Sequence, residues 1–174
     1  MDTIQLTLIL RKDKFTRGVF QGVYPSDKLP ASVSQYLVLY IANVDTSDKP
    51  GSHWVAFYFT KEQERQFLDS YGAPPGKYSG TFTPFLNNNS NQWIFNTVTL
   101  QSIYSKLCGH YCLYFALYRS RQISMSTIVY RFSNNTRKND SLVKRFIEKH
   151  FPISLPKYRT DVSKQRAQAQ HKVQ

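Results

Sequence analysis

Four segments of the chain have the hydrophobic pattern of β-strands. Continuous apolar runs with aromatic and β-branched residues predict three buried strands, and an alternating pattern predicts a fourth. These strands are 35–44, 53–59, 67–71 and 94–101. Polar residues 45–52 predict a turn, and the charged residues 61–66 predict a hairpin connection.

Helical spacing of apolar residues follows the strands. The strongest pattern covers 108–121, and a short helix is expected around Thr83–Leu86. Two further helices are predicted at 124–132 and 140–150. Strands followed by helices predict an α+β fold, with a central mixed β-sheet flanked by helices.

The first thirty residues are less clear. Residues 2–12 alternate like a strand, yet Asp2 and Thr3 suit a helix N-terminus, so both structures stay open. Residues 15–30 contain two Gly and two Pro and predict a loop. A single domain is expected over 1–156, followed by a disordered tail at 157–174 that lacks periodicity.

Composition excludes several classes of protein. Of 174 residues, 41% are hydrophobic, which is enough for a globular core. No apolar run approaches the roughly 20 residues of a membrane span, and no signal peptide is apparent, so no membrane partner is expected. Two cysteines four residues apart do not form a disulfide framework, which favours an intracellular location. The four scattered histidines predict no metal site.

Positive charge is concentrated in the C-terminal part of the chain. The net charge is +12, and residues 131–174 hold 11 Lys/Arg against three Asp/Glu. This excess predicts either nonspecific contact with DNA or only a solvated, solubilising tail, and the sequence favours neither.

Four residues at the ends of predicted elements suit thiol catalysis. Cys108 begins the strongest helix, where the helix dipole favours a thiolate, and Gly109 leaves room for a substrate backbone. If strands 53–59 and 67–71 form a hairpin, His53 and Asp69 become neighbours. Gln101 ends the fourth strand, seven residues before Cys108. Each of these residues alone is weak evidence, so the prediction depends on their convergence.

The order and spacing of these motifs resemble the adenain-like proteases of adenoviruses, related DNA viruses and Polinton-type elements. This family belongs to the same wider clan as the SUMO-deconjugating proteases. The matching motifs are His53-Trp54, Asp69, Gln101 and Cys108-Gly109. The string LQSIYSKLCGHYCLYFALYR (100–119) looks like the Polinton and adintovirus-like branch. FQGVYPSDKLP (20–30) resembles a segment of the same branch, and NDSLVKRFIEKHFP (139–152) the C-terminal helix of adenain.

The resemblance implies a role for each residue. Cys108 would be the nucleophile, His53 the general base and Asp69 the acid that orients His53. Gln101 would donate its amide to the oxyanion, together with the backbone N–H of Cys108. Trp54 would wall the substrate site. The second cysteine, Cys112, is expected to be an inert core residue.

The resemblance also implies an activity. We expect an endopeptidase that cleaves viral or mobile-element precursor proteins at Gly-containing sites during particle maturation. The enzyme would be a monomer in the nucleus or cytoplasm of a host cell, or in the virion. No cofactor is required, although a noncovalent peptide or DNA activator stays open. Residues 87–100 contain no Cys, which argues against an activator linked by a disulfide.

Two alternatives stay open at this point. The same chemistry would serve a deubiquitinase or SUMO-deconjugating protease. A basic nucleic-acid-binding protein with a degenerate site is the alternative from a different class.

Overall fold

Five strands form one mixed sheet in the computed structural model, which describes residues 1–60, 64–78, 80–89 and 92–152. The strands lie in the order β1-β2-β3-β4-β5. Both outer pairs, β1–β2 and β4–β5, are parallel, whereas β2–β3 and β3–β4 are antiparallel. The strand bounds are β1 Phe20–Pro25, β2 Val38–Asn43, β3 Trp54–Phe59, β4 Arg65–Leu68 and β5 Trp93–Phe95.

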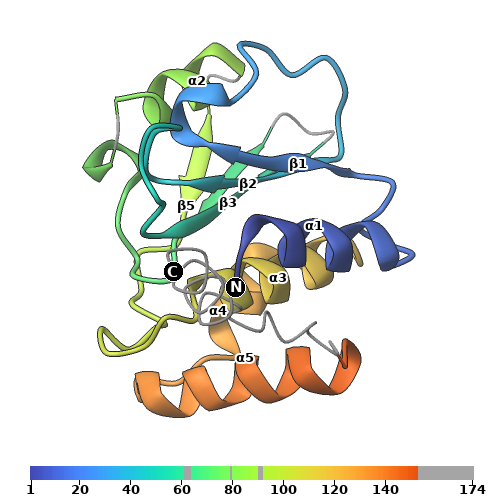
Figure 1. Ribbon diagram of the computed structural model, residues 1–174, viewed down its shortest axis with the longest axis vertical. Helices are drawn as coiled ribbons and strands as arrows, with labels where there is room; N and C mark the ends of the chain where they lie inside the picture. The colour runs from blue at the N-terminus through green and yellow to red at the C-terminus, as the bar shows by residue number, and fades with distance from the viewer. Residues whose placement is uncertain (61–63, 79, 90–91, 153–174) are drawn as a thin grey trace, which may run out of the picture.

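Helices cover both faces of this sheet (Figure 1). Helices α1 and α3 lie on one face, α2 lies on the other, and α5 packs on the far side of α3. The architecture is therefore the α+β fold that the sequence predicts. The helix bounds are α1 Thr3–Lys12, η1 Ser26–Lys28, η2 Pro75–Lys77, α2 Phe82–Asn89, α3 Cys108–Arg119, α4 Met125–Tyr130 and α5 Thr136–His150.

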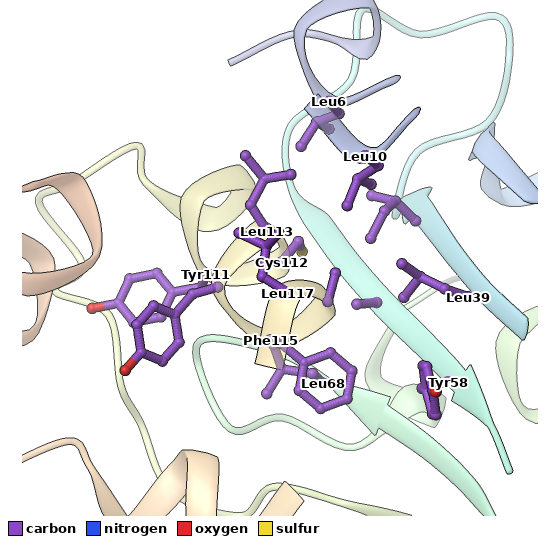
Figure 2. Close-up of a cluster of buried hydrophobic side chains, with 14 of the residues drawn as sticks. Leu6, Leu10, Leu39, Tyr58, Leu68, Tyr111, Cys112, Leu113, Phe115 and Leu117 are labelled. Atoms are coloured by element: carbon purple, nitrogen blue, oxygen red, sulfur yellow. The ribbon is translucent and has the colours of Figure 1, made fainter. Parts of the chain in front are cut away.

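The period-two alternation of the strands divides the core into two clusters. Successive strand side chains point to opposite faces, so neighbouring residues join different clusters. Leu39 and Ile41 pack with α1 and α3, whereas Val38, Tyr40 and Ala42 pack with α2. Figure 2 shows the first cluster, in which Cys112 lies among Leu113, Phe115 and other apolar side chains. Both faces of β2 are buried, which explains its continuous apolar sequence.

The structure resolves the ambiguity at the N-terminus and corrects the prediction for the next segment. Residues 3–12 are helical, because the carboxylate of Asp2 accepts the backbone N–H of Gln5 and the Gln5 side chain accepts that of Asp2. The predicted loop at 15–30 is wrong in its centre, where β1 pairs with β2. Gly22 and Pro25 hide this strand in the sequence, but an edge strand with one neighbour tolerates both.

Two strand predictions need correction near the site. Strand β4 begins at Arg65, within the predicted connection, and it ends before Asp69. The predicted strand 94–101 is wrong after Phe95, because the chain leaves the sheet as a loop there. The helices lie close to their predicted positions, with α5 starting earlier, at Thr136.

Within the described residues, no helix is long and apolar enough to cross a membrane. The predicted tail, 157–174, lies outside the described residues.

Candidate active site

Strand register brings His53 and Asp69 together. Strands β3 and β4 are antiparallel, with Ala56 opposite Leu68, so the start of β3 lies beside the end of β4. His53 directly precedes β3 and Asp69 directly follows β4. His53 Nε2 and Asp69 Oδ1 form a hydrogen bond of 2.6 Å, and both residues are buried.

Both carboxylate oxygens of Asp69 are fully used. Oδ1 accepts from His53 and from the backbone N–H of Tyr71 at 3.1 Å. Oδ2 accepts from the backbone N–H of Ala73 at 2.9 Å and from the Tyr78 hydroxyl at 2.7 Å. Burial raises the pKa of Asp69, but the hydrogen bonds from His53 and Tyr78 outweigh burial and leave the pKa below its ordinary value. Asp69 is therefore an anion fixed in place.

The side chain of Asn96 holds the backbone of Asp69. Its Oδ1 accepts the backbone N–H of Asp69 at 2.9 Å, and its Nδ2 donates to the carbonyl of Asp69 at 2.6 Å. The same Nδ2 donates to the carbonyl of Val98 at 3.1 Å. The side-chain amide of Asn96 thus takes the place of a backbone pairing between Asp69 and an extended β5. This explains how the chain leaves the sheet at this point without stranding buried polar groups.

Cys108 begins α3 next to His53. Helix α3 packs against β3, and its first turn leaves backbone N–H groups without helical partners, which favours negative charge there. Burial raises the pKa of the Cys108 thiol, but the hydrogen bond with His53, backbone hydrogen bonds involving Trp54 and Gly109 and the charge of His53 lower it below its ordinary value. These interactions favour the thiolate form of Cys108.

The imidazole of His53 is poised to be protonated. Burial lowers its pKa, but hydrogen bonds to Asp69 and Cys108 and the charges of both raise it to about 9. Because Nε2 bonds with Asp69, Nδ1 is the ring nitrogen available to Cys108. The lowered thiol pKa and the raised imidazole pKa together favour a thiolate–imidazolium pair at neutral pH.

Gln101 lies in the loop that leads to Cys108, not at the end of a strand as predicted. Its side chain is buried, and its orientation is fixed at both ends of the amide. Oε1 accepts from the Ser70 hydroxyl at 2.7 Å, and Nε2 donates to the carbonyl of Ser105 at 2.9 Å and to the hydroxyl of Tyr71 at 3.3 Å.

Helices α3 and α5 anchor the loop that carries Gln101. The carbonyl of Leu100 accepts from the Tyr111 hydroxyl and from Asn139 Nδ2, each at 3.0 Å. Tyr111 also bonds with the buried carboxylate of Asp140 at 2.9 Å. Residues far away in sequence therefore hold the loop that carries Gln101.

Two tyrosines lie against the imidazole. The ring of Tyr71 stacks on His53, with 4.8 Å between centroids and 30° between the ring planes. The ring of Tyr78 lies 5.8 Å from His53. Aromatic faces carry partial negative charge, so both rings favour a protonated imidazole.

Trp54 and Gly109 lie together next to the N-terminal residues. Trp54 Nε1 donates to the carbonyl of Met1 at 3.2 Å. A Cβ at Gly109 would lie 3.2 Å from Met1 Cβ and 3.4 Å from Trp54 Cδ1. Gly109 is therefore closely packed, and a larger residue there would push Trp54 or Met1 away.

Cys112 differs from Cys108 in its surroundings. It is buried in the core, and burial raises its pKa well above that of an ordinary thiol. The described residues contain no group of three or more His, Cys, Asp or Glu that could hold a metal ion.

The structure thus brings His53, Asp69 and Cys108 into one hydrogen-bonded chain, with Gln101 linked to it through Tyr71. Sequence reasoning missed the positioning residue, Asn96. It also missed the tyrosines at 71 and 78. The Asp-x-Tyr-Gly spacing before a Pro-Pro turn was the available signal for Tyr71, whereas no signal marked Asn96.

Comparisons with known proteins support the fold and no finer property. No family model and no curated protein matches this chain. The chain is similar to the crystal structure of ASFV pS273R protease, with a TM-score of 0.51 and 14% identity, covering 72% of this chain and 58% of that chain. A selenomethionine structure of the ASFV protease matches with a TM-score of 0.38 and 18% identity, covering 60% of this chain and 43% of that one. The chain thus spans about three fifths of the length of the first of these structures.

The two cysteines should differ sharply in alkylation. Iodoacetamide should label Cys108 in the native protein at neutral pH and leave Cys112 unlabelled, because the pKa of Cys108 is lowered whereas that of Cys112 is raised. His53→Ala should slow labelling by roughly tenfold, since it removes the partner that lowers the thiol pKa. Mass spectrometry of timed samples measures both rates. The matched control is His150→Ala on the exposed face of α5, and an equal loss in both variants would contradict this account.

The two hydrogen bonds between Asn96 and the backbone of Asp69 should contribute to the free energy of unfolding. Asn96→Ala leaves the buried N–H and C=O of Asp69 without their partners and should lower the free energy of unfolding by about 1–3 kcal/mol. Asn134→Ala, at an exposed position, should change it by less than about 0.5 kcal/mol. Urea titration of both variants measures the difference, and equal values would mean that these Asn96 hydrogen bonds do not stabilise the protein.

Proposed function

We propose that this protein is a cysteine endopeptidase that cleaves precursor proteins of a virus or mobile element. The observation that carries the proposal is the chain from Asp69 through His53 to Cys108, with a raised imidazole pKa and a lowered thiol pKa. A buried carboxylate, an oriented imidazole and a thiolate are the parts that nucleophilic acyl transfer needs. Likeness in fold to a viral protease supports the same reaction class.

In this mechanism the thiolate of Cys108 attacks the carbonyl carbon of the scissile peptide bond. The electron pair of the C=O π bond moves to oxygen, where the amide of Gln101, in the loop before Cys108, is proposed to stabilise the charge. Collapse of this intermediate expels the amine, which takes its proton from the imidazolium of His53. Water then hydrolyses the thioester, with the neutral imidazole acting as the base.

Two cavities, one lined by Trp54 and one by His53, favour an endopeptidase. A cavity of about 380 Å³ begins at Trp54 and is bounded by Met1, Asn43 and Gly51. Another, of about 550 Å³, begins at His53 and includes Tyr71 and Ile103. A chain that occupies both would place its scissile bond between Trp54 and His53. The departing amine then leaves along the cavity that His53 lines, because His53 supplies its proton.

The substrate proposed has Gly before the scissile bond. The resemblance to adenain-like proteases implies this Gly, and Gly109 itself, packed against Met1 and Trp54, adds no side chain next to Cys108. The proposed substrate is a precursor cut at such sites during particle maturation. Removal of ubiquitin or SUMO, whose chains end in Gly, would use the same preference and is the alternative within the class.

Cleavage of matched peptides tests the proposed function. A peptide with Gly before the scissile bond should be cleaved by the wild-type protein and not by Cys108→Ala. Replacing that Gly by Val should lower kcat/KM by about 10²-fold, because the proposed site accepts a residue without a side chain next to Cys108. Chromatography of the products measures both rates, and Cys112→Ala, which removes a thiol from the core, is the matched control with nearly full activity.

The outcomes separate the alternatives. Equal rates for the Gly and Val peptides would remove the Gly preference. Labelling of Cys108 by a ubiquitin or SUMO vinyl-sulfone probe would favour deconjugation over maturation. No cleavage and no labelling by any probe would overturn the proposal of a protease.

A second proposed property is nonspecific DNA binding by α5. Exposed Arg137, Lys138, Lys144 and Arg145 surround a surface groove of about 870 Å³ on this helix. A basic helical face with no base-reading pattern suits phosphate contacts. DNA binding would hold the enzyme close to precursor proteins that are packaged together with the genome.

Salt-dependent binding to duplex DNA tests this property. Binding should be insensitive to sequence and should fall steeply between about 50 and 200 mM salt. Lys144→Gln with Arg145→Gln should reduce the salt slope by about two, whereas Lys12→Gln with Lys28→Gln should leave it nearly unchanged. Fluorescence anisotropy with labelled duplexes measures the slopes. Equal slopes in both double variants would mean that α5 does not contact DNA.

A further inference from the structure

The amide of Gln101 poses a problem for an oxyanion hole. An amide nitrogen carries two N–H groups, and both already have acceptors within the described residues. One donates to the carbonyl of Ser105 at 2.9 Å, and the other to the hydroxyl of Tyr71 at 3.3 Å. The amide cannot rotate to free a donor, because Oε1 is held by the Ser70 hydroxyl at 2.7 Å.

The two acceptors of Gln101 are chemically different. The carbonyl of Ser105 can only accept a hydrogen bond, so that N–H is committed to the loop. A phenol oxygen accepts a hydrogen bond and also has a proton to donate. The longer bond is also the weaker one, and a negatively charged oxygen is a stronger acceptor than a phenol. The N–H that faces Tyr71 is therefore the one whose acceptor can itself donate a proton to a further oxygen.

The backbone fixes the position of Tyr71. The Asp69 carboxylate accepts its N–H at 3.1 Å, and the N–H of Gly72 closes a turn onto the carbonyl of Asp69 at 2.9 Å. Gly72 has φ +72°, and a Cβ there would lie 2.7 Å from the carbonyl carbon of Val98. This turn returns the ring of Tyr71 over His53, with 4.8 Å between centroids.

One tyrosine therefore spans the site between the imidazole and the amide. Its ring covers His53, its hydroxyl meets Gln101, and it lines the cavity of about 550 Å³ that begins at His53. The proposed role of Gln101 brings the oxygen of a carbonyl attacked by Cys108 close to this amide. That oxygen then also meets the hydroxyl of Tyr71.

We propose that the hydroxyl of Tyr71 is a donor of the oxyanion hole, which accepts an N–H from Gln101 and donates its own O–H to the oxyanion. The proposal rests on the proposed protease function and adds a catalytic residue to it. As the C–S bond to Cys108 forms, the electron pair of the C=O π bond moves to oxygen, and the Tyr71 proton bonds to that oxygen without leaving the phenol. Collapse of the intermediate restores the C=O bond and breaks the C–N bond.

Two features of the site favour this role. A hydroxyl that accepts a hydrogen bond becomes a stronger donor, so the bond from Gln101 strengthens the one to the oxyanion. Burial, together with the nearby charges of Cys108 and Asp69, raises the pKa of Tyr71, so the phenol keeps its proton while Cys108 is a thiolate. Gln101 then acts on the oxyanion in part through Tyr71.

Tyr71→Phe tests the hydroxyl alone, because the ring that covers His53 stays. With the Gly-containing peptide, kcat should fall by about 10²-fold with little change in KM. The double variant Tyr71→Phe with Gln101→Ala should lose less than the product of the two single losses, because the bond from Gln101 strengthens the one that Tyr71 donates. Alkylation of Cys108 by iodoacetamide should keep its wild-type rate in Tyr71→Phe, because this reaction forms no oxyanion.

The matched control is Tyr104→Phe, which removes a hydroxyl from a side chain that is 83% exposed and should leave kcat unchanged. An unchanged or higher kcat in Tyr71→Phe would mean that the hydroxyl only fills the site, which overturns the proposal. An equal fall in alkylation would show an effect through His53, with the same consequence. A wild-type protein that cleaves no peptide and reacts with no probe would overturn both the protease function and this role, whereas active wild type with unaffected Tyr71→Phe would overturn this role alone.

Discussion

The buried carboxylate of Asp69 is the constraint on which the rest of the site depends. A charge removed from water is costly unless it is fully hydrogen-bonded, and Asp69 accepts four hydrogen bonds, two on each oxygen. Each donor comes from a different part of the turn that follows β4 or from His53. The same four bonds therefore close the turn, fix the imidazole and keep the carboxylate negative.

Asp69 affects the pKa of the Cys108 thiol through His53. A raised imidazole pKa favours the imidazolium, whose positive charge then lowers the thiol pKa of Cys108. The first turn of α3 adds its unpaired N–H groups to this effect. Cys112 lies one turn further along the same helix and has the opposite pKa shift, because it faces the apolar core. The neighbouring His53 therefore lowers one thiol pKa, and burial raises the other.

Sequence patterns predicted the elements that pack tightly and missed those held by side-chain hydrogen bonds. Apolar runs predict β2, β3 and α3 because both faces or nearly all sides of these elements are buried. Strand β1 escaped prediction, since a parallel edge strand needs a partner distant in sequence and tolerates Gly and Pro. The end of β5 was missed because the Asn96 side chain, not a turn motif, ends the pairing. His53, Asp69 and Cys108 could be placed from order and spacing, whereas Tyr71 depends on a turn geometry that only coordinates show.

The charge state of His53 tests this account most directly. An NMR titration of its imidazole should show a ring that stays protonated through neutral pH and loses its proton near pH 9. Asp69 and Cys108 raise the pKa of His53 and outweigh the opposing effect of burial. A titration at or below the ordinary value of about 6.5 would mean that no thiolate–imidazolium pair exists at neutral pH, and would contradict the account.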